Sequence, residues 1–586
     1  MDRNTVLALA LSMMVFSGWV FWQSVRNPLP VAEEENAVVH ETAPTPAAVA
    51  LPAPETKPSA WSEPLQPRSV EDQEATTPRP FASAPPSETP PLAQTPDPPA
   101  WEHSFEMPLY HVLLSNRGAS IRSWTLTDPL YLEHTAEGTH PIELLTLEAP
   151  YDQALRTPFT GLDLGDLGDA VYEVETQGAD GVSFVLRRAG LTIRKQYRFE
   201  SESYQFHLSI SVKNESQRTV EPRFTLQWPA HTNPEQDFVE QSLVTFHDDG
   251  VEREMINSVG LPGFFSRFTG SAEEGLPTQY AGDNLWAGID LKYFIAAILP
   301  DRTRTADVVF QPLVPGKVGA TVLFFTPVQL PPGQIIEHEF EGYMGPKVPE
   351  LLDATGSELS KSINLGYGWI APLTSFFAWL LRAIYTFIPN YGVAIIILTV
   401  LVRIVTLPIM GKQMKSMERM RDLQPRVKEL QAKHADDRQK QSEAMMKLYK
   451  EEGVNPMGGC LPMLLQFPVF IGLFFALQSS IELRDAPFFG YITDLSAPAT
   501  LFVIPGIDLP VRLLPILMGL SMVVQQRMTP MTMDPAQARM MMTVMPVMMT
   551  VLFYQFPSGL VLYWMVSNLL GIAHQYWVGQ KQRAAA

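Results

Sequence analysis

The sequence predicts a multi-span α-helical membrane protein that carries a large antiparallel β-sandwich outside the bilayer. Apolar runs of membrane-spanning length recur after residue 390. Before them, residues 101–345 contain short runs in which apolar and polar residues alternate, as half-buried strands require. The charge is also segregated, because residues 351–586 carry 20 Lys and Arg against 15 Asp and Glu, although the whole chain has a net charge of −19.

The first element is an uncharged apolar run over residues 5–22, preceded by Arg3. We expect a transmembrane anchor over residues 1–24 with its amino terminus in the cytoplasm. A cleaved signal peptide is the alternative. The bulky Trp19 and Trp22 disfavour it, because they stand where a cleavage site needs small residues and they suit an interfacial anchor.

Residues 25–101 are predicted to be a disordered linker. There are 18 prolines between Pro28 and Pro99, and no regular hydrophobic period accompanies them. Such a segment buries too little apolar surface to offset the entropy of ordering it.

Residues 102–346 are predicted to form the sandwich. Five apolar residues, from Tyr204 to Val212, alternate with polar ones, and His207 lies on the polar side. We therefore expect His207 to be a solvated residue rather than a ligand. Similar runs occur at Val182–Arg187, Arg223–Trp228, Lys317–Phe325 and Ile335–Tyr343.

A connector over residues 347–389 contains an amphipathic helix at Pro372–Ile388. It has 17 residues and includes Arg382, so we expect it to lie in the membrane interface rather than to span. Five predicted spans follow, at residues 390–410, 458–483, 511–527, 539–556 and 557–580.

The loops between these spans predict the topology. Residues 411–457 contain 11 Lys and Arg, whereas residues 484–510 contain Arg484 at their edge, with Arg512 just beyond. By the positive-inside rule, residues 411–457, the 528–538 loop and the short tail at 581–586 are cytoplasmic, and residues 25–389 and 484–510 are outside. With the anchor, this makes six spans and two cytoplasmic termini. Apolar spacing on both sides of a polar turn at His434–Asp437 predicts a hairpin of two helices in residues 411–457. Its charges are either a solvated face or a contact surface for a partner.

Arg403 lies twelve residues inside an apolar run. A guanidinium in hydrocarbon would cost roughly 2.5 to 3.5 kcal/mol, so we expect Arg403 to face water or a partner. Snorkelling toward the interface near Met410 is the alternative. Gln466 and Asn568 place amides in other spans, where interhelical hydrogen bonds would also account for them. Twenty of the 26 methionines follow residue 400, which fits either core packing or a surface for varied apolar partners.

Several function classes are disfavoured. No predicted span has Asp or Glu at its centre, which argues against a cation-coupled transporter. No phosphate loop, HExxH pair or nucleophile elbow is found, so we expect neither catalysis nor a cofactor or metal. Cys460 is the single cysteine, which excludes an intramolecular disulfide. The acidic surface disfavours nucleic acid as a partner.

Four stretches together resemble the YidC membrane protein insertase family, and the resemblance extends over about residues 365–580. They read VRIVTLPIMGKQMKSMERMRDLQPRVKEL, LYKEEGVNPMGGCLPMLLQFPVFIGLFFAL, IELRDAPFFGYITDLSAP and FPSGLVLYWMVSNLLGIAHQ. WAGIDLKYFIAAILP, at Trp286–Pro300, looks like the end of the family's periplasmic domain. The resemblance implies a five-helix core in the bacterial inner membrane, an additional anchor, and a periplasmic sandwich of the carbohydrate-mutarotase-like kind.

The resemblance also implies a hydrophilic groove that opens to the cytoplasm and the lipid but not to the periplasm. Arg403, Gln466, Tyr563 and Asn568 match its polar residues. A surface along which a client helix slides is matched by Phe467, Pro468, Phe470, Pro546, Leu552 and Phe553. Gln555 and Gly571 depart from the family pattern, which often has an aromatic residue and a hydroxyl there. The tail GQKQRAAA lacks the long basic extension of some members.

The implied function is insertion and folding of client transmembrane helices, alone or with the Sec translocon. The implied partners are nascent membrane proteins, the lipid bilayer and the ribosome, with no nucleotide or other cofactor. Two rival functions are a small-solute transporter or channel and an anchored carbohydrate-binding module.

Overall fold

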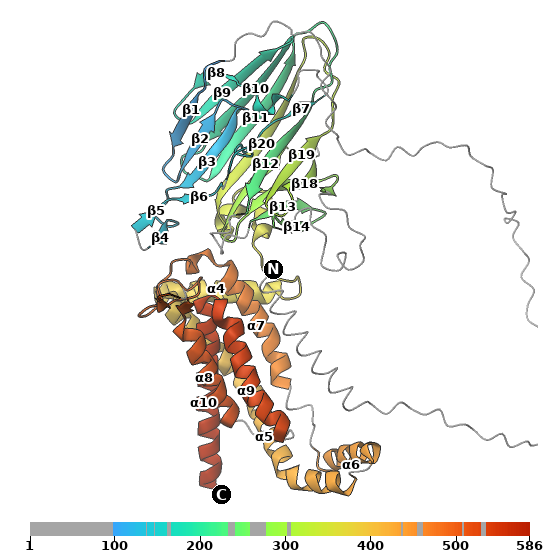
Figure 1. The fold of residues 1–586 in the computed structure, drawn as a ribbon, viewed down its shortest axis with the longest axis vertical. Coiled ribbons are helices and arrows are strands. Elements are labelled where there is room, and N and C mark those ends of the chain that lie inside the picture. Colours follow the sequence, from blue (N-terminus) through green and yellow to red (C-terminus); the bar gives the residue numbers. More distant parts are fainter. Residues whose placement is uncertain are drawn as a thin grey trace, which may run out of the picture. The chain divides into compact units, whose positions relative to one another are not determined.

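The computed structural model describes residues 98–585 apart from short gaps at 136–137, 146, 161–165, 233–240, 258–276, 302–305, 435–436, 454–460, 507–508 and 529–534. The predicted anchor at 1–24 and almost all of the predicted linker at 25–101 lie outside the described residues. The described chain consists of a β-rich part followed by a helical part (Figure 1).

The β-rich part contains three main antiparallel sheets, which confirms the prediction of a β-rich domain. The largest has nine strands in the order β14 (Gly250–Met255), β13 (Ser242–His247), β16 (Asn284–Asp290), β17 (Phe294–Pro300), β20 (Ile335–Pro346), β11 (Gln205–Asn214), β10 (Leu191–Phe199), β9 (Gly181–Arg188) and β8 (Glu173–Gln177). The second has five, in the order β15 (Thr278–Tyr280), β18 (Ala306–Val314), β19 (Val318–Phe325), β12 (Arg223–His231) and β7 (Phe159–Thr160). The third has four, β1 (Glu102–Glu106), β2 (Tyr110–Ser115), β3 (Ser120–Leu126) and β6 (Ile142–Glu143). A small hairpin of β4 (Glu133–Thr135) and β5 (Gly138–His140) and the 3-10 turn η1 (Leu167–Asp169) complete the β-rich part.

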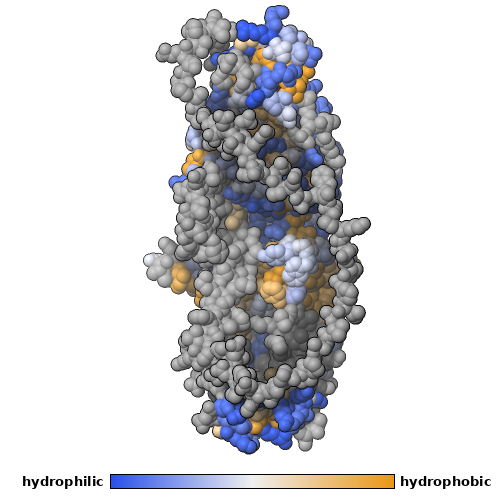
Figure 2. Space-filling model, turned by 90° about the vertical axis from the view of Figure 1, so that its right-hand side faces the viewer, coloured by the Kyte–Doolittle hydropathy of each residue, from blue (hydrophilic) through white to orange (hydrophobic). Residues whose placement is uncertain are grey.

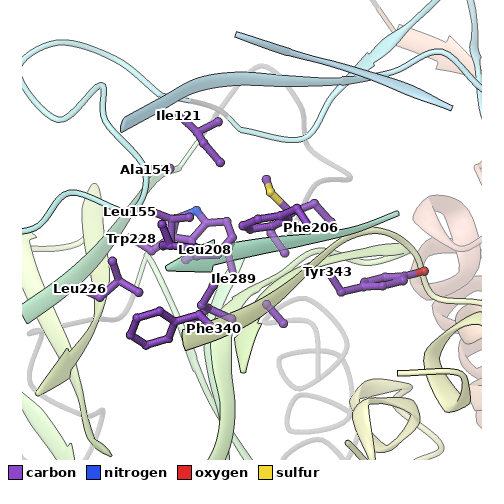
Figure 3. Close-up of a cluster of buried hydrophobic side chains, with 14 of the residues drawn as sticks. Ile121, Ala154, Leu155, Phe206, Leu208, Leu226, Trp228, Ile289, Phe340 and Tyr343 are labelled. Carbon is purple, nitrogen blue, oxygen red and sulfur yellow. The ribbon is translucent and has the colours of Figure 1, made fainter. Parts of the chain in front are cut away.

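The core lies between the nine-stranded sheet and the other two. Along β11, the residues from Phe206 to Val212 alternate between buried and half-buried, as predicted. The ring of Trp124 on β3 lies 5.5 Å from that of Phe206. From the five-stranded sheet, Thr321 Oγ1 on β19 donates a 2.8 Å hydrogen bond to the carbonyl of Gly288 on β16. Figure 3 shows how residues from several strands converge on this core, including Ile121, Trp228 and Phe340.

His207 lies on the polar side of β11, as the alternation predicts, and its side chain is 35% exposed, so it is partly solvated. Its Nε2 lies 3.0 Å from Glu200 Oε1.

The core of the β-rich part contains a buried lysine, a residue type that is seldom fully buried. Lys195 on β10 is fully buried, and its Nζ donates to the carbonyls of Gly118 (3.1 Å) and Leu155 (2.9 Å). Burial lowers the pKa of Lys195 to about 7, because the charged amine loses its hydration. Lys195 thus joins β10 to two loops that sequence periodicity does not connect.

We expect Lys195 to make stability depend on pH. Its folded-state pKa is depressed below the ordinary value of about 10.4, so between about pH 7 and pH 10 the unfolded chain binds a proton that the folded chain does not. The free energy of unfolding should therefore rise with pH across this window. Lys195→Met should flatten the rise, as measured by thermal unfolding of the solubilised chain at several pH values. Lys213→Met is a matched control, since the side chain of Lys213 is 44% exposed and paired with Glu215. An unchanged pH slope in Lys195→Met would contradict this role.

The helical part begins after β20. Its elements are α3 (Pro349–Asp353), η2 (Leu359–Ser362), α4 (Ala371–Phe387), α5 (Tyr391–Lys433), α6 (Arg438–Glu451), α7 (Leu461–Ser479), η4 (Ile481–Leu483), β21 (Phe502–Ile504), β22 (Leu509–Val511), α8 (Leu513–Met528), α9 (Pro535–Leu552), η5 (Phe553–Gln555) and α10 (Ser558–Ala585). Helix α10 packs against α8 and α5, α9 packs against α8, and α4 packs against α7 and α5. The bundle of α5 and α7 to α10 is visible in Figure 1.

Helix α5 crosses the boundary that the sequence placed at residues 410 and 411. It continues for 43 residues and contains Pro408 and Pro425. Its start is capped by Asn390, whose side chain accepts a 3.0 Å hydrogen bond from the backbone N–H of Val393. The sequence changes from apolar to charged along the helix, but no turn interrupts it. The change in polarity therefore reflects a change of surroundings and not the end of the helix.

Helix α6 follows α5 in the chain, in the region where the sequence predicts a second helical segment. Asp437 caps it by accepting a hydrogen bond from the backbone N–H of Lys440. Met420 and Leu423 on α5 pack against Tyr449 on α6. Figure 2 shows hydrophilic (blue) and hydrophobic (orange) residues side by side on the visible surface of the described chain.

Three of the other predicted spans contain shorter apolar stretches, and the fourth lies in α10, which has 28 residues. Among the described residues, Tyr391–Pro408 is the one helical window that is both long and apolar enough to cross a membrane. Shorter apolar stretches occupy Gln466–Ser479, Leu513–Met528 and Met542–Gln555. Two helices end earlier than predicted, since α7 stops at Ser479 and α9 gives way to η5 after Leu552.

Candidate functional site

Arg403 is held against α10. Its Nη2 donates two hydrogen bonds of 2.7 Å, to the backbone carbonyl and to the hydroxyl of Ser567. The Arg403 side chain is half-buried, whereas Ile404 and Val405 beside it are exposed and apolar. The guanidinium therefore points into the bundle, toward a polar partner on another helix.

Tyr563 and Gln466 make a second polar contact on α10. Gln466 Nε2 on α7 donates to Tyr563 Oη over 2.8 Å. Tyr563 is 2% exposed and lies one helical turn before Ser567. The contacts of Arg403 and Gln466 are thus stacked along one face of α10.

Asn568 lies on α10 next to Ser567 but contacts a different helix. Its Nδ2 donates a 3.0 Å hydrogen bond to Ser521 Oγ on α8, and both side chains are buried. Tyr563 and Asn568 therefore lie on the helix that Arg403 and Gln466 contact. Helices α5, α7 and α8 each provide one side chain that forms a hydrogen bond with α10.

Gly571 on α10 has no side chain, which leaves room for neighbouring side chains close to Arg403. A Cβ at this position would lie 2.6 Å from Gln525 Nε2 and 3.8 Å from Arg403 Nη2. The amide of Gln525, on α8, thus occupies the place that a larger residue would take.

Sequence reasoning missed Ser567, Ser521 and Gln525. Ser567 lies four residues after Tyr563, so helical spacing alone places it on the same face.

The six residues matched to a client-sliding surface do not all lie on a surface. Phe467 is 51% exposed, but Phe553 is 3% exposed and Pro546 is buried. Pro468, Phe470 and Leu552 are half-buried. The exposed large apolar residues described on α9 are instead valines, at Val544, Val547 and Val551.

Phe470 and Phe553 belong to an aromatic cluster inside the bundle. Each ring lies 4.9 Å from that of Trp564 on α10, and the two phenylalanines are 6.3 Å apart. These contacts join α7, η5 and α10, so the two side chains fix the spacing of helices. Sequence matching could not separate this role from exposure to a client.

Gln555 and Gly571 are the two departures from the family pattern. Gln555 is exposed in η5, whereas Gly571 is buried beside Gln525 and Arg403. The departure at Gly571 is the one that alters the surroundings of the arginine.

A separate cavity of about 530 Å³ lies on the outer face of the nine-stranded sheet. His207, Arg198, Glu339, Glu341 and Asp301 supply its charged lining. Within the described ranges, no group of three or more His, Cys, Asp or Glu side chains is arranged to hold a metal ion.

Comparison with known proteins relates both parts of the chain to one family. A family model described as "60Kd inner membrane protein" matches residues 383–585, and one described as "YidC periplasmic domain" matches residues 103–380. A protein of Syntrophus aciditrophicus named membrane protein insertase YidC is 32% identical over 99% of this chain and 100% of its own length. A protein of the same name from Geobacter sulfurreducens is 35% identical over 81% of this chain and 85% of its own length.

Solved structures with similarity include an active YidC insertase, which is 19% identical with a TM-score of 0.35 and covers 81% of this chain and 92% of its own. A putative aldose 1-epimerase from Escherichia coli, 9% identical with a TM-score of 0.30, covers 42% of this chain and 99% of its own. The two family models and the near full-length relatives are decisive: this chain belongs to the YidC membrane protein insertase family, as an inner membrane protein with a β-rich periplasmic domain.

Proposed function

We propose that this chain inserts client transmembrane helices into the inner membrane through a hydrophilic groove that contains Arg403. The observation that carries the proposal is the pair of hydrogen bonds from Arg403 to Ser567, within a bundle of apolar helices. A guanidinium among membrane-spanning helices is energetically costly unless it contacts polar groups or water, so the presence of Arg403 favours a functional role. The names of the full-length relatives agree with this function.

The proposed topology has six spans, made by an anchor at residues 1–24 and by α5, α7, α8, α9 and α10. Both termini and the α5–α6 hairpin lie in the cytoplasm, with the linker and the sandwich in the periplasm and α4 in the outer interface. The 11 Lys and Arg in residues 411–457 support this orientation.

In the proposed mechanism, the polar and often acidic amino-terminal segment of a client enters the groove. Arg403 attracts the acidic groups, and Gln466, Tyr563 and Asn568 offer hydrogen-bonding partners in place of hydrocarbon. The apolar helix of the client meanwhile partitions into lipid, which supplies the driving force at roughly 25 cal/mol per Å² of apolar area. No nucleotide is consumed.

The client helix would move along the exposed residues beside the groove. Phe467 on α7 and the three valines on α9 offer such a surface, and Pro468, Phe470 and Leu552 line its edge. Pro546 and Phe553 would support it from inside. Ribosomes would bind the α5–α6 hairpin or the loop at 528–538, and the Sec translocon would be an additional partner.

A photoreactive residue at position 466 tests the groove, because this position belongs to it and Arg403 stays in place. Crosslinking to the amino-terminal segment of a stalled nascent client is expected there and should be much weaker from position 405, because Val405 is 75% exposed on the outer face. Equal crosslinking from both positions would reject the groove.

Two experiments test the alternative functions. Ion or solute flux through the reconstituted protein without any client would favour the channel alternative. Loss of insertion on deleting residues 102–345 alone would favour the sandwich as the functional part.

A further inference from the structure

The short hairpin β21–β22 carries apolar side chains that are exposed, as far as the chain is described. Leu501, Phe502, Val503 and Leu509 are 43–54% exposed. Phe502 pairs with Val511, Val503 with Pro510 and Ile504 with Leu509, so exposed residues occur on both faces of the two-stranded sheet. From Ala497 to Val511 the sequence contains one charged residue, Asp508. A two-stranded hairpin of this kind is marginal in water by itself.

The base of this hairpin is nevertheless firmly attached to the bundle. On the first strand's side, Ser558 Oγ at the start of α10 donates to the carbonyl of Ala497 and accepts from the backbone N–H of Ala499. On the second strand's side, Arg512 Nη1 donates to the carbonyl of Tyr554 over 2.7 Å, and Tyr554 Oη donates to the carbonyl of Pro510. The exposed apolar residues are therefore held in place relative to the helices.

The helix that follows is short for a membrane span. Helix α8 has 16 residues, which corresponds to about 24 Å, against a hydrocarbon thickness of about 30 Å. Its outer face is apolar, with Ile516, Leu517, Leu520 and Val524 exposed. The exposed residues of the hairpin come shortly before the first turn of α8 in the chain. Arg512, at the junction, turns its guanidinium toward Tyr554, whose ring centroid lies 5.4 Å away.

We propose that the β21–β22 hairpin is a lipid anchor that inserts Leu501, Phe502, Val503 and Leu509 into the outer interface of the bilayer and supplies the apolar length that α8 lacks. A lipid surface fits better than a protein partner, because the hairpin leads within two residues into an apolar helix whose exposed side chains are also apolar. The edges of a two-stranded sheet keep unpaired backbone groups, which excludes the middle of the hydrocarbon and places the hairpin at its boundary.

The proposal rests on the membrane placement of α8 but not on the insertase mechanism. The test uses the full-length chain with Cys460→Ser, reconstituted into phosphatidylcholine and phosphatidylglycerol vesicles. A single cysteine at Phe502 or Val503 carries an environment-sensitive fluorophore. Leu520→Cys on α8 serves as the lipid-facing reference, and Val328→Cys in the sandwich, 41% exposed, serves as the aqueous reference.

We expect the labels at 502 and 503 to emit at shorter wavelength than the label at 328. Lipids that carry a nitroxide high on the acyl chain should quench them more strongly than lipids that carry it near the chain end. Aqueous iodide should quench them less than the label at 328. Iodide quenching equal to that at 328, or no quenching by nitroxide lipids, would overturn the anchor while the label at 520 still reports on α8. If the label at 520 also escapes the nitroxide lipids, the membrane placement of α8 itself fails, and the anchor fails with it.

Discussion

Replacing Arg403 by alanine is expected to lower insertion of clients with acidic amino-terminal segments by on the order of 100-fold. Placing one charge at the centre of a membrane costs roughly 2.5 to 3.5 kcal/mol, and a factor of ten corresponds to about 1.4 kcal/mol. The alanine variant loses both the positive charge and the two hydrogen bonds to Ser567. The measurement is protease protection of a short-tailed client in proteoliposomes that contain the purified variant.

Two further variants separate charge from geometry. Arg403→Lys keeps the charge and should retain most of the insertion of acidic-tailed clients. Ser567→Ala removes one of the two hydrogen bonds but leaves the charge and the carbonyl of residue 567, so a small loss is expected. Equal activity of the alanine and lysine variants would reject the electrostatic part of the mechanism.

The second large effect is expected at Gly571. A valine there would meet the amide of Gln525, since even its Cβ would lie 2.6 Å from Gln525 Nε2, and its branches would approach Arg403. Overpacking of this kind costs about 1 to 3 kcal/mol, and here it would also disturb the surroundings of the guanidinium. Gly571→Val should therefore lower both the thermal stability of the solubilised protein and its insertion activity.

A double-mutant cycle identifies the cause. Gln525→Ala removes the side chain that the introduced valine would meet, so the two substitutions together should be less harmful than the sum of their separate effects. Gly579→Val is the matched control on the same helix, because a Cβ there has no neighbour within 4 Å. Strictly additive effects of the changes at 571 and 525 would show that the glycine serves another purpose.

Local periodicity predicted much of the fold. The alternation along β11 identified its buried side, because a strand turns successive side chains to opposite faces. The predicted amphipathic helix at residues 372–388 appears as α4, displaced by one residue at each end. Helix ends were less predictable, as the unbroken α5 illustrates, since a change in polarity does not require a turn.

The sequence by itself determined the division into a β-rich part and apolar helices, the asymmetry of charge between the loops, and the presence of Arg403 within an apolar run. The tertiary structure decided which groups meet: Arg403 and Ser567 are 164 residues apart in the chain, and Gln466 and Tyr563 are 97 residues apart. It also decided that Phe553 lies inside the bundle. The physical reason is that apolar spacing specifies which face of a helix is buried, whereas the rotation and depth of each helix depend on how all its neighbours pack.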